Sequence, residues 1–308
     1  MNIKKVLITK KSFLLFLLFL IFLSSNFTAC RSFSLNDIES PESEDNLTGK
    51  NADSDSEQPV VAAASIIPVG EFIREIGGKR VDVIVMVPPG AEPHVYEPTP
   101  RQLVELSRAK IYVKLGSGID FELGLMDKIA EINKKMMFVN CSDGIEMLDD
   151  PHIWVSLKNA KIIIENIYRG FAELDPENIS MYTENKDIFL EKIEKLDKEI
   201  SEMLKDKKNR KFMVYHPAWT YFASDYNLEQ IPIEYEGKEP TIKNIENLIE
   251  EARKNNIRVI LASPQFSTKS AEVISDEIDA EVVLIDPLAS NYIDNIKTVA
   301  KVLDTYLE

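Results

Sequence analysis

Four side chains that can bind a metal ion follow apolar runs that read as strands. The chain has three histidines, and each of them stands beside a proline. The three are His94 in "GAEPHVYEPTP", His152 in "DPHIW" and His216 in "KFMVYHP", while Asp286 ends the apolar run "EVVLID". In open α/β sheets, ligands bind beyond the carboxyl ends of the strands. We therefore expect these four groups to converge in the folded chain.

Three imidazoles and one carboxylate form a nitrogen–oxygen ligand set. Such a set suits tetrahedral Zn²⁺, with bond lengths of about 2.0–2.2 Å. Mn²⁺ prefers more oxygen ligands and lies low in the affinity order, whereas Cu²⁺ would bind the same groups at least as strongly. The residues therefore predict a metal site with His94, His152, His216 and Asp286 as ligands. The set suits zinc, availability decides between zinc and copper, and manganese is the less suited alternative.

The elements that must position these groups alternate regularly from residue 60 onward. Short apolar runs typical of buried parallel strands are each followed by a helical pattern, four times before residue 176 and four times after residue 208. Thr99 and Pro100 are expected to be the N-cap and first residue of one helix. We predict an α/β fold of two lobes, each with a four-stranded, mainly parallel sheet flanked by helices, joined by one long spine helix.

The domain boundaries follow from this alternation. Residues 59–175 are predicted to form an N-terminal metal-binding lobe and residues 209–308 a C-terminal metal-binding lobe. Residues 176–208 between them carry apolar side chains at steps of three or four, which predicts a long linking helix.

The first 58 residues differ in composition from the rest. Residues 1–29 combine several lysines with an apolar run at 13–23, which is shorter than the roughly 20 residues that cross a bilayer. This pattern is typical of a signal peptide. "SSNFTAC" resembles the lipobox of bacterial lipoproteins, with Cys30 as the lipidated residue; an uncleaved anchor or a conventional cleavage site is the alternative. We expect residues 30–58 to form a disordered, polar tether.

The charge of the chain argues against nucleic acid as a partner, and its cysteine content argues against a reactive thiol. The net charge is -15, with 51 acidic against 36 basic residues, which argues against nucleic acid as a partner. If Cys30 carries lipid, Cys141 is left alone in an apolar run, where we expect a buried, unreactive thiol.

Five stretches together resemble one known family. "GAEPHVYEPTP", "DPHIW", "YHPAWTYFASDYNL", "IEYEGKEPT" and "LIDPLASNY" are similar to segments of the solute-binding proteins of zinc and manganese ABC transporters, the metal-binding lipoproteins of cluster A-I. The resemblance covers about residues 60–308. It implies His94, His152, His216 and Asp286 as ligands, and histidine at 216 resembles the zinc branch. The chain departs from the family after Trp154 and lacks the histidine- and acid-rich loop of many zinc members.

The resemblance implies a binding protein that is not an enzyme. It would be a monomer that captures a divalent metal outside the cytoplasm and delivers it to an ABC permease driven by a cytoplasmic ATPase. A lipid anchor would hold it on the outer face of the cell membrane, in the periplasm if the envelope has two membranes. A zinc hydrolase and a surface adhesin are the alternatives from other classes, and no HExxH motif supports the hydrolase.

Overall fold

A computed structural model describes residues 58–235 and 237–308 of the chain. The predicted signal peptide, Cys30 and nearly all of the predicted tether lie outside the described residues. Within the described ranges, none of the helices combines the length and the apolar character that crossing a bilayer requires.

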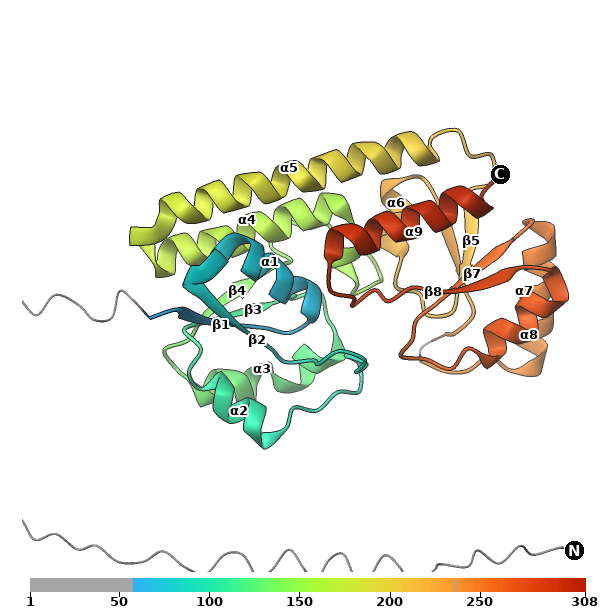
Figure 1. The fold of residues 1–308 in the computed structure, drawn as a ribbon. Coiled ribbons are helices and arrows are strands. Elements are labelled where there is room, and N and C mark those ends of the chain that lie inside the picture. The colour runs from blue at the N-terminus through green and yellow to red at the C-terminus, as the bar shows by residue number, and fades with distance from the viewer. Residues whose placement is uncertain (1–57, 236) are drawn as a thin grey trace, which may run out of the picture. The chain divides into compact units, whose positions relative to one another are not determined.

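The first sheet has four parallel strands in the order β2-β1-β3-β4. These strands are β1 (Val60–Ala64), β2 (Val81–Val85), β3 (Ile111–Lys114) and β4 (Met137–Asn140). The helices of this lobe are α1 (Ile67–Gly77), α2 (Pro100–Leu106), α3 (Asp120–Ile132) and α4 (Leu157–Leu174). Helices α1 and α4 cover one face of the sheet, and α2 and α3 lie on the other (Figure 1).

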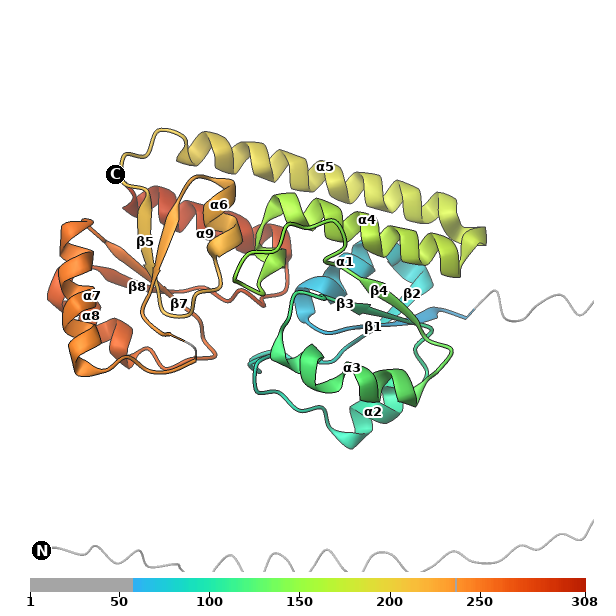
Figure 2. The same ribbon diagram turned by 180° about the vertical axis from the view of Figure 1, so that it is seen from behind.

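The second sheet repeats this plan in the order β6-β5-β7-β8, again with all strands parallel. Its strands are β5 (Lys211–Val214), β6 (Glu229–Pro232), β7 (Val259–Ala262) and β8 (Glu281–Leu284). Its helices are α6 (Thr220–Asp225), α7 (Ile242–Lys254), α8 (Lys269–Ile278) and α9 (Tyr292–Tyr306). Helices α7 and α8 lie on the outer face, and α6 and α9 face the long helix (Figure 2). The predicted α/β class with two parallel four-stranded sheets is confirmed.

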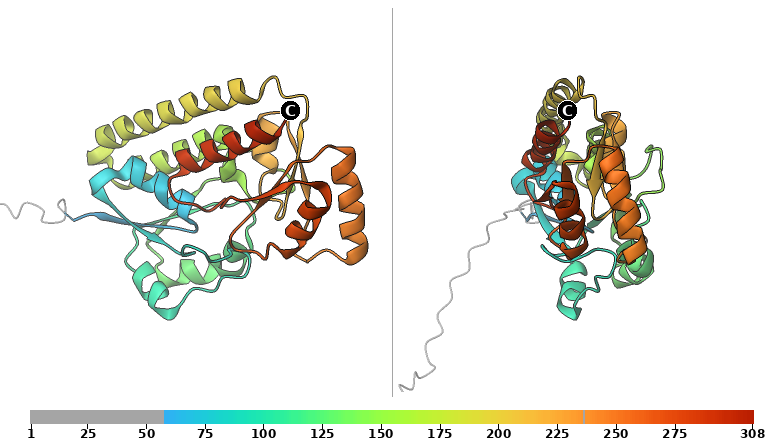
Figure 3. Two further views of the ribbon diagram at one scale, coloured as in Figure 1. Left: turned by 45° about the vertical axis from the view of Figure 1, so that its right-hand side comes forward. Right: turned by 90° about the vertical axis from the view of Figure 1, so that its right-hand side faces the viewer.

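Helix α5 (Ile179–Leu204) packs against α1, α4 and α9, so it contacts helices from both lobes (Figure 3). Its 26 residues measure about 39 Å at the usual helical rise. The helix begins later than the predicted boundary at 176 because Pro176–Asn178 forms a separate 3₁₀ turn. Its buried side chains recur at helical spacing: Tyr182, Phe189, Ile193, Leu196, Ile200 and Leu204.

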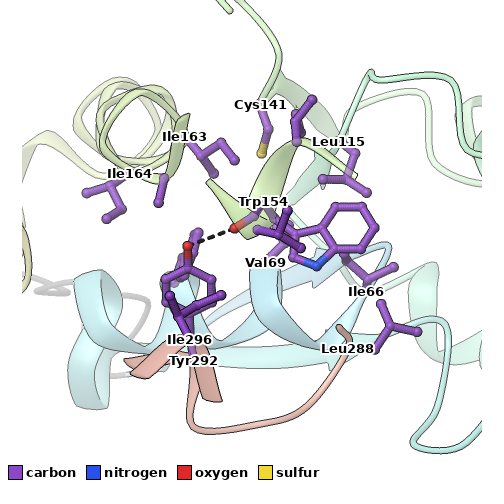
Figure 4. Close-up of a cluster of buried hydrophobic side chains, with 14 of the residues drawn as sticks. Ile66, Val69, Leu115, Cys141, Trp154, Ile163, Ile164, Leu288, Tyr292 and Ile296 are labelled. Atoms are coloured by element: carbon purple, nitrogen blue, oxygen red, sulfur yellow. Dashed lines mark hydrogen bonds between the residues drawn. The ribbon is translucent and has the colours of Figure 1, made fainter. Parts of the chain in front are cut away.

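One cluster of buried apolar side chains extends through both lobes, and a second, smaller cluster lies under α7 and α8. Trp154 belongs to the larger cluster and packs near Leu288 and Tyr292 from the second lobe (Figure 4). The hydroxyl of Tyr292 donates a hydrogen bond to the Trp154 carbonyl at 2.7 Å. The two lobes therefore share a core as well as a linking helix.

Two local predictions are confirmed. Thr99 caps α2 by accepting a hydrogen bond from the Gln102 backbone, the Gln102 side chain accepts one from the Thr99 backbone, and Pro100 is the first helical residue. Cys141 is fully buried. Burial raises the pKa of its thiol well above the usual value, so it is an unreactive core side chain.

Candidate metal centre

The three histidines meet beyond the carboxyl ends of strands from both sheets. His94 lies in the connection from β2 to α2, His152 in the connection from β4 to α4, and His216 directly after β5. Each offers one nitrogen, and these atoms all lie within 4.8 Å of one another. The Nε2 atoms of His152 and His216 are 3.2 Å apart. Ligand nitrogens around a tetrahedral zinc ion stand about 3.3 Å apart, so this pair is already at that spacing.

Each histidine pairs its Nδ1 with a carboxylate. The pairs are His94 with Asp120 at 2.8 Å, His152 with Asp150 at 2.6 Å, and His216 with Glu234 at 2.7 Å. Because a carboxylate accepts hydrogen bonds, each Nδ1 must donate, and the Nε2 of each neutral ring carries a lone pair. Lone pairs that converge without a proton between them repel one another, and a cation removes that repulsion. This carboxylate–histidine arrangement is typical of metal ligands.

Burial supports the neutral form of His152. Its ring is 7% exposed, and burial lowers its pKa below the usual value, against the opposing effect of Asp150. Burial would raise the pKa of Asp150, but hydrogen bonds from His152 and Thr220 hold that pKa below its usual range. A neutral imidazole and an ionised partner are the forms that a metal ligand requires.

Aromatic side chains wall the site. Phe266 stacks on His216 with ring centroids 4.8 Å apart, and Trp154 lies 5.0 Å from His152. The hollow bounded by these rings and the three histidines has a volume of about 20 Å³. That space holds one water molecule or one ion.

A larger hollow of about 380 Å³ adjoins the histidines. Five carboxylates line it: Glu92, Asp120, Asp149, Asp150 and Glu234. A cleft lined by one sign of charge concentrates counter-ions. This hollow therefore favours the approach of cations to the three histidines.

Asp286 lies apart from the three-histidine group within the described residues. Its Oδ1 accepts hydrogen bonds from Gln265 Nε2 at 2.9 Å and from the Leu288 backbone at 2.8 Å. Its neighbours Pro287 and Leu288 line the small hollow. The structure thus brings together three of the four predicted ligands. The fourth, Asp286, lies next to residues that line the small hollow.

Sequence reasoning missed the three carboxylates that hold the histidines. Asp120 opens α3 after β3, Asp150 precedes His152 by two residues, and Glu234 follows β6. The strand-end rule that identified the histidines applies to these positions as well. Applied to every acidic residue after a strand, it would have included all three.

Comparison with known proteins identifies the family. A family model described as "Zinc-uptake complex component A periplasmic" matches residues 62–306. The chain belongs to this family. Members of the zinc-uptake component family are solute-binding proteins and not enzymes. The expected family and the expected non-enzymatic class are therefore confirmed.

Individual members are similar over most of the chain. The high-affinity zinc uptake system protein ZnuA of Bacillus subtilis (strain 168) is 27% identical over 243 residues, or 72% of this chain and 76% of that protein. The zinc-binding protein AdcA of Streptococcus pyogenes serotype M3 is 27% identical over 263 residues, or 76% of this chain. The match spans 51% of AdcA, about half its length. A crystal structure of ZnuA has a TM-score of 0.78 and 40% identity, covering 82% of this chain and all of that one.

Proposed function

We propose that this protein captures Zn²⁺ outside the cytoplasm and delivers it to an ABC permease that a cytoplasmic ATPase drives. The observation that carries the proposal is the convergence of one nitrogen from each of three imidazole rings, and the Nδ1 of each ring is held by a carboxylate. The small hollow beside these nitrogens has room for one ion. Relatives named as zinc uptake or zinc-binding proteins favour zinc as the cargo.

His94, His152 and His216 are the proposed ligands, with Asp286 as the fourth. Both hydrogen bonds that the Asp286 carboxylate accepts end on Oδ1, so Oδ2 is the oxygen proposed to reach the ion. A shift of the short segment 286–288 would carry it there. In that arrangement Zn²⁺ has the four nitrogen and oxygen ligands that suit it.

The site opens towards the hollow lined by five carboxylates. A hydrated cation is attracted there first and then exchanges its water for imidazole nitrogens. Electrostatic attraction of this kind raises the association rate and weakens with ionic strength.

The proposed location follows from the first 58 residues. A lipid on Cys30 would hold the protein, as a monomer, on the outer face of the cell membrane, in the periplasm if the envelope has two membranes. The tether would give the folded body a reach of roughly 30 Å. Metabolic labelling with a fatty acid tests this anchor, because Cys30→Ala should abolish incorporation of the label.

Native mass spectrometry with competing Zn²⁺ and Mn²⁺ tests the cargo, using residues 59–308 as a soluble body. We expect one bound Zn²⁺ per chain and exclusion of Mn²⁺ at equal concentrations. His216→Ala should abolish this preference, and His216→Glu should shift it towards Mn²⁺, because Mn²⁺ prefers oxygen ligands. Unchanged preference and affinity in both variants would show that His216 is not a ligand.

Asp286 needs a separate pair of variants. Asp286→Ala removes both oxygens, whereas Asp286→Asn keeps one acceptor for the bonds from Gln265 and Leu288. If Asp286 binds the ion, both variants lose zinc affinity. If it only holds the segment, Asp286→Asn keeps wild-type affinity. Deletion of the gene should abolish high-affinity zinc uptake by cells, which distinguishes transport from a purely structural or adhesive role.

A further inference from the structure

A buried carboxylate lies in the first lobe, outside the metal site. Glu122 is 4% exposed, and its Oε1 and Oε2 accept hydrogen bonds from the Leu115 and Gly116 backbones at 2.6 and 2.8 Å. Ser65 Oγ also donates to Oε1. Because the hydroxyl of Ser65 has one hydrogen to give, Tyr112 must donate to Ser65 across their 3.0 Å contact. The carboxylate therefore accepts from three donors.

The loop that Glu122 binds, residues 115–120, reaches two of the proposed ligands. Ser117 Oγ donates a 2.6 Å hydrogen bond to the carbonyl of Pro151, which directly precedes His152. At the end of the loop, Asp120 Oδ2 pairs with Nδ1 of His94 at 2.8 Å. One short loop thus contacts both histidine segments of the first lobe.

Leu115 and Ile119 pack in the core near the two ends of this loop, whereas residues 116–118 between them have no apolar side chain to pack and depend on hydrogen bonds. Gly116 has a φ of +69°, and a Cβ added there would clash with the Asn140 side chain. Gly118 also has a positive φ, of +94°. Burying a carboxylate is costly unless donors satisfy it, so the three donors and the carboxylate hold one another in place.

We propose that Glu122 is a positioning residue of the metal site, which fixes loop 115–120 and thereby orients His94 through Asp120 and His152 through Pro151. The inference rests on the proposed function, because it assigns these two histidines to the site. Glu122 itself does not line either hollow beside the histidines. Its effect on the metal is therefore indirect, through the backbone of residues 115–120.

Glu122→Gln is the decisive variant because it keeps the size of the side chain and removes one acceptor. The amide oxygen can still accept from Leu115 and Ser65, but the NH₂ group would then face the N–H of Gly116. That donor would lose its partner, and the loop would be released at Gly116. Ser117→Ala, by comparison, removes only the bond to Pro151.

The first readout uses metal-free protein and the three histidines of the chain. Long-range ¹H–¹⁵N correlation spectra, recorded where the rings are neutral, distinguish Nδ1–H from Nε2–H tautomers. In the wild type we expect Nδ1–H for all three. Glu122→Gln should shift His94 towards mixed tautomers, and His152 to a smaller extent because Asp150 also holds its ring. It should leave His216 unchanged, since Glu234 holds His216 in the other lobe. Ser117→Ala should shift His152 alone.

The second readout is zinc affinity by competition with a chelator. Glu122→Gln should raise the dissociation constant about tenfold, the lower end of what loss of an outer-shell partner costs a metal site. Ile129→Ala is the matched control, because Ile129 is fully buried on the same helix and takes no part in these hydrogen bonds. It should lower thermal stability without changing histidine tautomers or zinc affinity.

Two results would overturn the inference. One is wild-type tautomers and wild-type zinc affinity in folded Glu122→Gln and Ser117→Ala. The other is an equal effect of Ile129→Ala on the spectra. Failure of the proposed function has a different signature, because wild-type protein would then not bind zinc while the tautomer shifts in metal-free protein would still appear.

Discussion

His94 and His152 belong to the same lobe, yet the protein holds them in different ways. The His152 ring is 7% exposed and its partner Asp150 is 2% exposed. The His94 ring is 21% exposed and its partner Asp120 is 63% exposed. A hydrogen bond in the protein interior is electrostatically stronger than one in water, so His152 is held more firmly.

The connections around each histidine extend this contrast. Five hydrogen bonds tie the segment around His152 to the second lobe: Leu148 N to Tyr221 Oη, Thr220 N to Asp150 Oδ2, Trp154 Nε1 to Pro287 O, Tyr292 Oη to Trp154 O, and Ser156 Oγ to Asp225 Oδ2. Beside His94, in contrast, Val95 is 74% exposed. His152 and His216 thus form a fixed pair across the lobes, and His94 is the adjustable third group.

The division of the chain into two lobes therefore differs from the division of the site into a fixed pair, His152 and His216, and an adjustable His94. His152 belongs to the first lobe in sequence, but hydrogen bonds join its segment to the second lobe. We therefore expect metal binding and release to depend chiefly on the loop that carries His94 and on the segment 286–288 that carries Asp286.

The strongest test replaces each carboxylate partner by its amide. Asp150→Asn should weaken zinc binding about 100-fold and Asp120→Asn about tenfold, the two ends of the usual range for such partners. Asp150 is buried and bound by both His152 and Thr220, whereas Asp120 is largely exposed. Isothermal titration with a competing chelator measures both constants. Equal losses would contradict the distinction between a fixed and an adjustable histidine.

Removal of zinc should affect the two loops unequally. At a free zinc concentration 100 times the dissociation constant, openings that release the ion become about 100-fold rarer. Hydrogen exchange of the Val95 amide, which is bonded only to Glu92 O nearby, should slow by about this factor when zinc is added. Amides in the segment 148–156 should change less, because bonds to the second lobe hold them in both states. A larger change in hydrogen exchange for the amides of segment 148–156 would show that His152, and not His94, is the adjustable histidine.

The Trp154 hydrogen bond to Pro287 tests what fixes the His152 segment. Trp154→Phe keeps an aromatic ring but leaves the buried Pro287 carbonyl without this donor, at a cost of about 2 kcal/mol. Urea denaturation of the metal-free protein measures the loss. Zinc affinity should fall severalfold, because the segment is held less firmly. Wild-type stability together with wild-type affinity would show that this bond does not hold the segment.

Asp175 provides a control away from both loops. Burial would raise its pKa, but hydrogen bonds from Arg80, Tyr182 and Asn178 hold that pKa below its usual value of 3.8. The stability it contributes is present above this value and is lost as the pH falls through the lowered pKa. Asp175→Asn should destabilise the protein by about 2 kcal/mol at neutral pH and flatten the loss of stability below about pH 4. Zinc affinity should not change, and a change would imply coupling that the structure does not contain.

The architecture could be predicted from the sequence because it rests on periodicity. Apolar strands, helical spacing and the Thr99–Pro100 cap are local patterns, and they identified all eight strands as well as the long helix. The order of strands in each sheet is not local and was not predicted. The start of α5 was placed too early, because Pro176 opens a 3₁₀ turn and not the helix itself.

The site could be predicted only in part. Histidines are scarce, so three of them at strand ends stand out, whereas the chain has 51 acidic residues. Asp149 and Asp150 are adjacent and chemically identical, yet only Asp150 is buried and bound to a histidine. Glu122 is still harder to recognise, because its role depends on two backbone amides and a serine 57 positions earlier in the chain. Such partners are assigned by the fold and not by residue type.

The shared hydrophobic core has a consequence for the design of zinc biosensors. Sensors built on binding proteins usually join one fluorophore to each lobe and read a change in their separation. Here a common core and α5 join the lobes, so that separation should hardly change. An environment-sensitive dye on the exposed Val95 position would instead report the local rearrangement around His94. Because the lobes are joined rigidly, the loop that carries His94 is a better position for a reporter dye than the two lobes.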